Sequence, residues 1–154
     1  MNNKWFKWGA CIIVLLFLLF IKLPVIQFDF GQEIYYLKSD AFHLKWIHSV
    51  EKEEWVEIYQ RHKDEIILTE TYFKTFGAGV PADGEIIESE DGYVHMRIDR
   101  QMADFNLIVS ENAQTKLVTE EAEIALYELT DEYGNISISV EYIHLWEYVG
   151  GSYL

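Results

Sequence analysis

A histidine and four glutamates lie close together in WIHSVEKEEWVEIY, residues 46–59. His48 and Ser49 are the residue types of a general base and a nucleophile. On a strand, neighbouring side chains point to opposite faces, so this pair cannot form the required hydrogen bond unless the strand ends there. The chain also lacks a G-x-S-x-G nucleophile elbow. The segment therefore does not favour a serine hydrolase.

The same residues have the donor atoms of a metal site. His48, Glu51 and Glu57 are suitable ligands, and His95 lies on another expected strand. However, the chain has no H-E-x-x-H motif, no histidines two positions apart and no calcium-loop spacing. We therefore expect no metal and no cofactor, and a metal-assisted envelope hydrolase stays open only as an alternative.

The segment FGAGVP, residues 76–81, is the second unusual feature. Gly77 and Gly79 on either side of Ala78 allow positive φ angles and can bring backbone N–H groups into the open, where they could hold a carboxylate. A tight connection between two sheets is the alternative interpretation. A phosphate cradle is disfavoured, because no G-K-[ST] follows.

Alternating apolar residues predict the elements that position these groups. The alternation over 42–46, 56–59, 94–99, 105–109 and 136–142 is typical of strands with one buried face, and Asp-Gly and Gly-Asn pairs mark turns. We expect an all-β fold, an antiparallel sandwich or a barrel-like domain. Residues 123–130 read as a strand paired with 136–143, or as a capped helix. The predicted core is Trp46, Val56, Ile58, Ile98, Leu107, Ile138 and Val140.

The N-terminal segment is a candidate membrane anchor. Residues 5–26 are largely apolar, with Trp5 and Lys7 near one end and Lys22 near the other, which are residues that favour the membrane interface. As a helix, residues 5–26 would extend about 33 Å, against about 30 Å for the hydrocarbon layer of a bilayer. Because no small-x-small cleavage site follows, we expect residues 1–26 to be a retained signal-anchor with the N-terminus cytoplasmic. Residues 27–154 would then form an extracytoplasmic domain at the cell membrane. A cleaved signal and a buried helix are the alternatives.

The charge of the chain narrows the class of partner. All 26 Asp and Glu lie after residue 28, against nine Lys and Arg. A phosphate backbone would be repelled, so we expect no binding to nucleic acid. The single cysteine, Cys11, excludes an intramolecular disulfide and a thiolate zinc cluster.

Together, HSVEKEEWVEIY and FGAGVP resemble the bacterial family called domain of unknown function 1850. The resembling positions are His48, Ser49, Val50, Glu51, Glu57, Tyr59, Phe76, Gly77, Ala78, Gly79 and Pro81. Genes of that family often lie beside those for TAXI-type TRAP transporter permeases. The resemblance implies a short anchored or secreted protein, and the gene association suggests an accessory role with the permease or its solute-binding protein as partner. We expect a membrane-anchored protein that is not an enzyme.

From these residues we predict a contact surface made of His48, Ser49, Glu51, Glu57 and Tyr59 with the loop Phe76–Pro81. The two segments should lie together in space. A small-solute-binding or sensor module is the alternative function.

Overall fold

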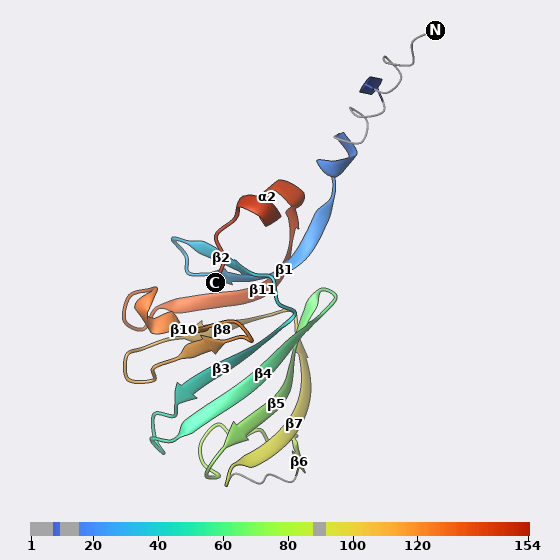
Figure 1. The fold of residues 1–154 in the computed structure, drawn as a ribbon. Coiled ribbons are helices and arrows are strands. Elements are labelled where there is room, and N and C mark those ends of the chain that lie inside the picture. The colour runs from blue at the N-terminus through green and yellow to red at the C-terminus, as the bar shows by residue number, and fades with distance from the viewer. Residues whose placement is uncertain (1–7, 10–15, 88–91) are drawn as a thin grey trace.

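The computed structural model describes residues 8–9, 16–87 and 92–154, and within these ranges the chain forms eleven strands and short helices (Figure 1). The strands are β1 (Lys22–Asp29), β2 (Ile34–Leu37), β3 (Ala41–Ile47), β4 (Glu54–His62), β5 (Glu65–Phe73), β6 (Glu85–Ile87), β7 (Val94–Met102), β8 (Asp104–Ile108), β9 (Lys116–Val118), β10 (Glu123–Ala125) and β11 (Asn135–His144). A 3-10 helix, η1 (Leu126–Glu128), follows β10, and the helix α2 (Leu145–Gly150) follows β11. The expected all-β fold is confirmed.

The strands form two antiparallel sheets. One has the order β2-β1-β11-β8, and the other has the order β10-β9-β3-β4-β5-β7-β6. Only Ala103 separates β7 from β8, yet the two strands belong to different sheets, so the chain passes from one sheet to the other at this corner. Within the described residues each sheet keeps two edge strands, which rules out the barrel-like form of the prediction.

Apolar side chains from both sheets meet in one core. Ile26 and Ile138 from the four-stranded sheet lie in the same cluster as Phe42, Leu44 and Ile66 from the seven-stranded sheet, and all five are almost completely buried. A smaller cluster contains Trp55, Phe73 and Met96. The two sheets therefore pack with their apolar faces against each other, as the alternation along the strands requires.

The predicted core is correct in part. Ile138 is fully buried, and Trp46, Ile98, Leu107 and Val140 are partly buried and pack against the clusters. The prediction for Val56 and Ile58 is wrong. The β3–β4 register sets Phe42 opposite Tyr59 and Leu44 opposite Glu57. Directly opposed residues share a face, so Trp55, Glu57 and Tyr59 face the interior and Val56 and Ile58 face the other side.

The expected pairing of residues 123–130 with 136–143 is also wrong. β10 covers only Glu123–Ala125 and pairs with β9, and the chain then continues as η1. β11 pairs with β1 on one side and with β8 on the other. The partner that we expected for residues 136–143 was residues 123–130, but β1 takes that place. Local sequence gives no sign of a pairing between two strands so far apart in the chain.

The N-terminal boundary needs a correction as well. Residues 22–26 belong to β1, paired with β11, and Val25 and Ile26 are buried in the domain. A helix through residue 26 is therefore wrong, because these residues satisfy their backbone groups in a sheet. Residues 1–7 and 10–15 of the expected anchor lie outside the described residues. Among the residues that the structure does describe, no helix has the length and apolar character needed to cross a membrane.

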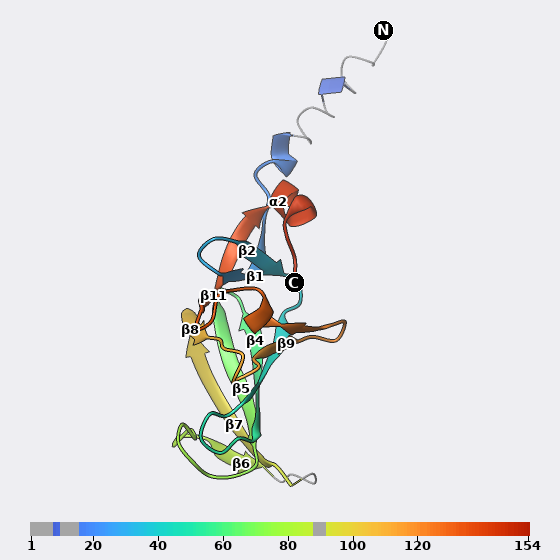
Figure 2. The same cartoon turned by 90° about the vertical axis from the view of Figure 1, so that its left-hand side faces the viewer.

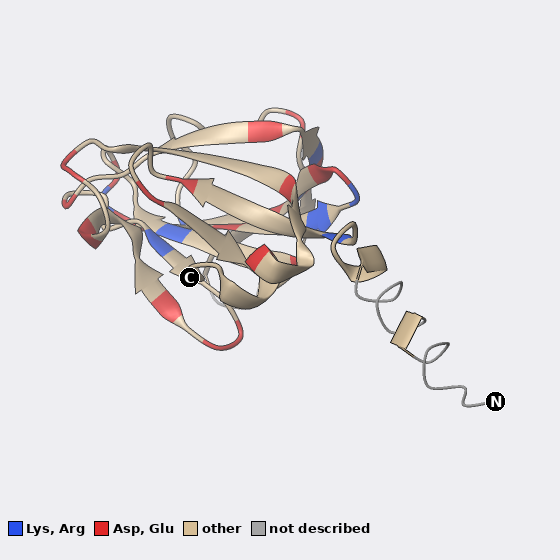
Figure 3. Cartoon of the chain, turned by 90° about the horizontal axis from the view of Figure 1, so that it is seen from above, with Lys and Arg blue, Asp and Glu red and all other residues tan. Residues whose placement is uncertain are grey.

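The two ends of the domain differ. The helical residues 16–18 lead into the domain at the end that carries α2, and β6 lies at the opposite end (Figures 1 and 2). Asp and Glu occur on loops and strands around the domain, whereas Lys and Arg are few (Figure 3).

Candidate functional site

Glu57 and Tyr59 face the interior from the middle of β4. The Tyr59 hydroxyl donates a hydrogen bond of 2.5 Å to Oε2 of Glu57, and Tyr59 itself is almost completely buried between the rings of Phe42 and Phe105. The carboxylate is therefore held against an aromatic stack by a partner two residues away on the same strand face.

The surroundings of Glu57 change its acidity. Burial raises the pKa of the Glu57 carboxyl above its ordinary value of 4.5, and the Tyr59 hydrogen bond and the Arg100 charge offset only part of this shift. Burial also raises the pKa of Tyr59, and the neighbouring Glu57 charge adds to the effect. Tyr59 therefore stays a neutral donor, while Glu57 binds its proton more tightly than an exposed carboxyl does.

A cavity of about 410 Å³ opens beside this pair. It is bordered by residues of β3 and β4, by the start of the turn after β3, by β8 and by the segment before β9. The lining residues are Leu44, Trp46, Ile47, His48, Ser49, Glu57, Tyr59, Phe105, Asn106, Leu107, Ile108, Ala113 and Thr115. Most are apolar or aromatic, and Glu57 is the acidic residue among them. A largely apolar hollow with a few converging polar groups is typical of small-molecule sites.

His48 and Glu51 lie in the turn that joins β3 to β4. The backbone N–H of His48 donates to the carbonyl of Glu53 at 2.8 Å, and Nδ1 of His48 pairs with the Glu51 carboxylate. The imidazole stacks on Trp55, with ring centroids 5.4 Å apart. His48 is therefore held between the cavity on one side and Trp55 on the other.

The glycine loop meets this turn at one place. A Cβ added to Gly77 would overlap the Glu51 carboxylate, so the loop backbone at Gly77 lies directly against the Glu51 side chain. The hydroxyl of Thr75 also donates to Glu53 at 2.8 Å. The expected proximity of the two segments is confirmed at these contacts.

The rest of the loop is anchored on one side and exposed on the other. Val80 packs against the cluster of Trp55, Phe73 and Met96, while Phe76, Ala78 and Gly79 are exposed. Gly79 has φ +87°, as the glycine-rich pattern predicts, and Pro81 is half-buried.

The structure divides the predicted contact surface into two parts. His48, Ser49, Glu57 and Tyr59 border the cavity, whereas Glu51 and residues 76–81 do not line it. Sequence reasoning missed Phe105, Asn106 and Thr115, because they come from β8 and from the segment before β9, which only the fold brings to this place. Thr115 is a buried polar residue, but burial cannot be read from its local sequence.

The four candidate metal ligands do not meet at one place, although His48 and Glu51 pair with each other. His95 lies on the opposite face of the seven-stranded sheet, where its Nε2 contacts the Glu70 carboxylate at 2.8 Å and its ring stacks on Tyr72. Across the part of the chain that the structure describes, no group of three or more His, Cys, Asp or Glu is arranged to hold a metal ion.

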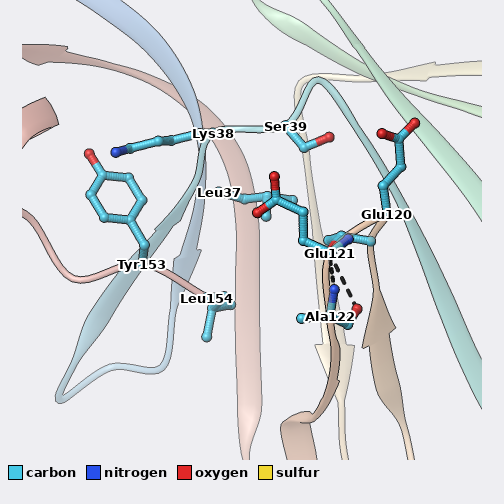
Figure 4. Close-up of a pocket in the computed structure, with 9 residues that line it drawn as sticks. Leu37, Lys38, Ser39, Glu120, Glu121, Ala122, Tyr153 and Leu154 are labelled. Atoms are coloured by element: carbon cyan, nitrogen blue, oxygen red, sulfur yellow. Dashed lines mark hydrogen bonds between the residues drawn. The ribbon is translucent and has the colours of Figure 1, made fainter.

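A larger hollow of about 560 Å³ lies elsewhere, between β2, the β9–β10 turn and the C-terminus (Figure 4). Its charged side chains are exposed: Lys38 lies over the ring of Tyr153 at 4.1 Å, and Glu120 and Glu121 project from the turn. None of the residues that the sequence singled out lines it, and its charged residues are exposed to solvent. The cavity at Glu57 is therefore the better candidate.

Residues 42–126 match the model of a family described as domain of unknown function (DUF1850), which is more than half of the chain. The chain belongs to the DUF1850 family. The matched region contains the whole lining of the Glu57 cavity and the glycine loop, while β1, β2 and β11 lie outside it. Neither the curated proteins nor the solved structures contain a match.

Proposed function

We propose that this DUF1850 protein is an extracytoplasmic, membrane-anchored module that binds a small solute in the Glu57 cavity and assists a TRAP-type transporter. The observation that carries the solute-binding part is a carboxylate on the wall of a 410 Å³ aromatic cavity, with a buried tyrosine as its hydrogen-bond donor. The transporter part rests on the family resemblance.

The lining favours a solute with an apolar body and one ammonium group. Glu57 supplies a negative charge, and Trp46 and Phe105 offer aromatic surface that suits both apolar groups and cations. The lining includes neither Lys nor Arg, and the acidic domain around it attracts cations rather than anions. Binding of an ammonium group would also lower the raised pKa of Glu57, since a nearby positive charge favours the carboxylate.

The experiment compares two solutes of similar shape and opposite charge. The full chain in detergent is titrated with phenethylammonium and with phenylpropionate while thermal stability is followed. We expect a concentration-dependent rise in melting temperature with phenethylammonium, and its loss in Glu57→Gln. Glu120→Gln, in the exposed β9–β10 turn, is the matched control. Equal effects of both solutes, or an unchanged response in Glu57→Gln, would contradict the proposal.

A second candidate function, docking to a transporter component, is favoured by an exposed apolar pair. Val50 is 68% exposed and Phe76 is 64% exposed, and they flank the place where Glu51 meets Gly77. Exposed apolar residues beside a preformed loop suit a protein contact. Co-purification of the full chain from membranes should recover a permease or solute-binding protein, and Val50→Ser with Phe76→Ser should lose it. Undiminished recovery would argue against this surface.

A further inference from the structure

We propose that the α2 end of the domain docks on the lipid surface, with Trp146 and Val149 entering the interfacial layer of the bilayer. This inference rests on the proposed membrane anchor, but it assigns a second, independent contact with the membrane.

Backbone geometry places α2 where the apolar segment ends. The uninterrupted apolar run, residues 8–21, finishes at Ile21, and the carbonyl of Ile21 accepts a 3.1 Å hydrogen bond from the backbone N–H of Leu145. The next residue, Lys22, pairs with His144 in the sheet. If residues up to Ile21 lie in the bilayer, α2 must lie at its surface.

The exposed face of α2 has the chemistry of an interface. Trp146 is 50% exposed and Val149 is 77% exposed, and residues three apart lie on one helix face. Stacking on His144, with centroids 4.1 Å apart, holds the Trp146 ring in place. Phe17 and Phe20 in the adjoining segment are 69% and 79% exposed, so apolar surface continues from that segment to α2. Tryptophan favours the level of the headgroups, since its ring is apolar and its N–H is polar.

The occupant is lipid, and its attraction does not depend on headgroup charge. Exposed Lys22 at this end is accompanied by exposed Glu141 and Glu147, so the charges are mixed. Apolar burial is then the driving term, and uncharged phosphatidylcholine vesicles are sufficient for the test.

The experiment measures depth at single positions of the full chain. Nitroxide labels are placed at Val149→Cys, Phe20→Cys or Ile86→Cys in a Cys11→Ser background, and the protein is reconstituted into phosphatidylcholine vesicles without any other protein. Ile86 is the matched control, because it is 62% exposed and lies on β6 at the other end of the domain. Frequent collisions of a label with a water-soluble nickel chelate show that the label lies in water. Frequent collisions with oxygen show that it lies in lipid.

We expect the label at 149 to collide with the nickel chelate several-fold less, and with oxygen more, than the label at 86. If the label at 20 lies in lipid and the label at 149 lies in water, the docking of α2 is wrong and the membrane anchor stands. If both labels lie in water, the docking and the anchor are both wrong. A second measurement needs no label: lipids brominated in the acyl chain should quench tryptophan fluorescence less in Trp146→Phe than in the natural protein, and equal quenching would also overturn the proposal.

Discussion

Glu57 is a carboxyl group that the packing of β4 places in the interior, on the wall of the candidate binding cavity. Its neighbours on the strand face, Trp55 and Tyr59, are core aromatics, so the fold carries a carboxyl group into the interior together with them. The cost of burying that charge appears as a raised pKa, and the Tyr59 hydroxyl offsets only part of it.

The raised pKa predicts how stability depends on pH. The folded protein holds the Glu57 proton more tightly than the unfolded chain, so this group contributes stability below pH 4.5 and loses it as the pH rises through the raised pKa. As the pH rises above 4.5 and through the raised pKa of Glu57, the free energy of unfolding of the natural protein should therefore fall relative to that of Glu57→Gln. Urea denaturation at each pH measures the difference. A constant difference would contradict the burial of this carboxyl.

Gly79 gives a second prediction at this scale. Its φ of +87° is strained for any residue with a Cβ, so Gly79→Val should lower the free energy of unfolding by about 1–2 kcal/mol. Ala78→Val, at the exposed neighbouring position, is the control and should change it by less than about 0.5 kcal/mol. Equal losses in the two variants would show that loop crowding, rather than backbone conformation, sets the cost.

Strand β4 shows at the element scale how register decides which residues are buried. Two sets of residues alternate along this strand: Val56 with Ile58, and Trp55 with Tyr59. Pairing with Phe42 and Leu44 on β3 places the second set in the interior. The two aromatic side chains bury more apolar area than Val and Ile would, which stabilises this choice.

Two identical substitutions test that assignment. Ile138→Ala removes a fully buried side chain from the core and should cost about 2–5 kcal/mol. Ile58→Ala, on the outer face of β4, is half-buried and should cost less than half as much. The free energies are measured by chemical denaturation. A larger loss for Ile58 than for Ile138 would reverse the assignment of faces.

For the whole molecule, the boundary between the N-terminal segment and the domain falls at Lys22. Strand β1 is central in the four-stranded sheet, between β2 and β11, and its Val25 and Ile26 are almost completely buried. The domain cannot be separated at residue 27 without cutting this strand.

Two truncations locate the boundary. A chain that begins at residue 21 should unfold cooperatively, because all of β1 is kept. A chain that begins at residue 27 loses five positions of pairing and two buried aliphatic side chains worth about 1.5–3 kcal/mol each, which is a large part of the 5–15 kcal/mol typical of a domain. We expect it to lack a cooperative thermal transition in circular dichroism. Equal transitions in the two chains would place the boundary at residue 27 or later, inside or after β1.

The sequence by itself determined the features that depend on local pattern. Alternation at Phe42–Trp46 and at Ile136–Ile138 predicted strands, because a side-chain period of two needs no knowledge of the partner. The glycines of FGAGVP predicted an unusual backbone, and Gly79 has one. His48 and Glu57 stood out as chemical groups before their surroundings were known.

Only the tertiary structure decided which strand faces and which distant residues meet. Register between β3 and β4 turned Glu57 inward, and the crossing from β7 to β8 brought Phe105 and Asn106 to the same cavity. The prediction of a membrane helix through residue 26 was wrong, since Val25 and Ile26 are as suitable for a core strand as for a membrane helix. Burial against residues more than 100 positions away, on β11, settled that choice.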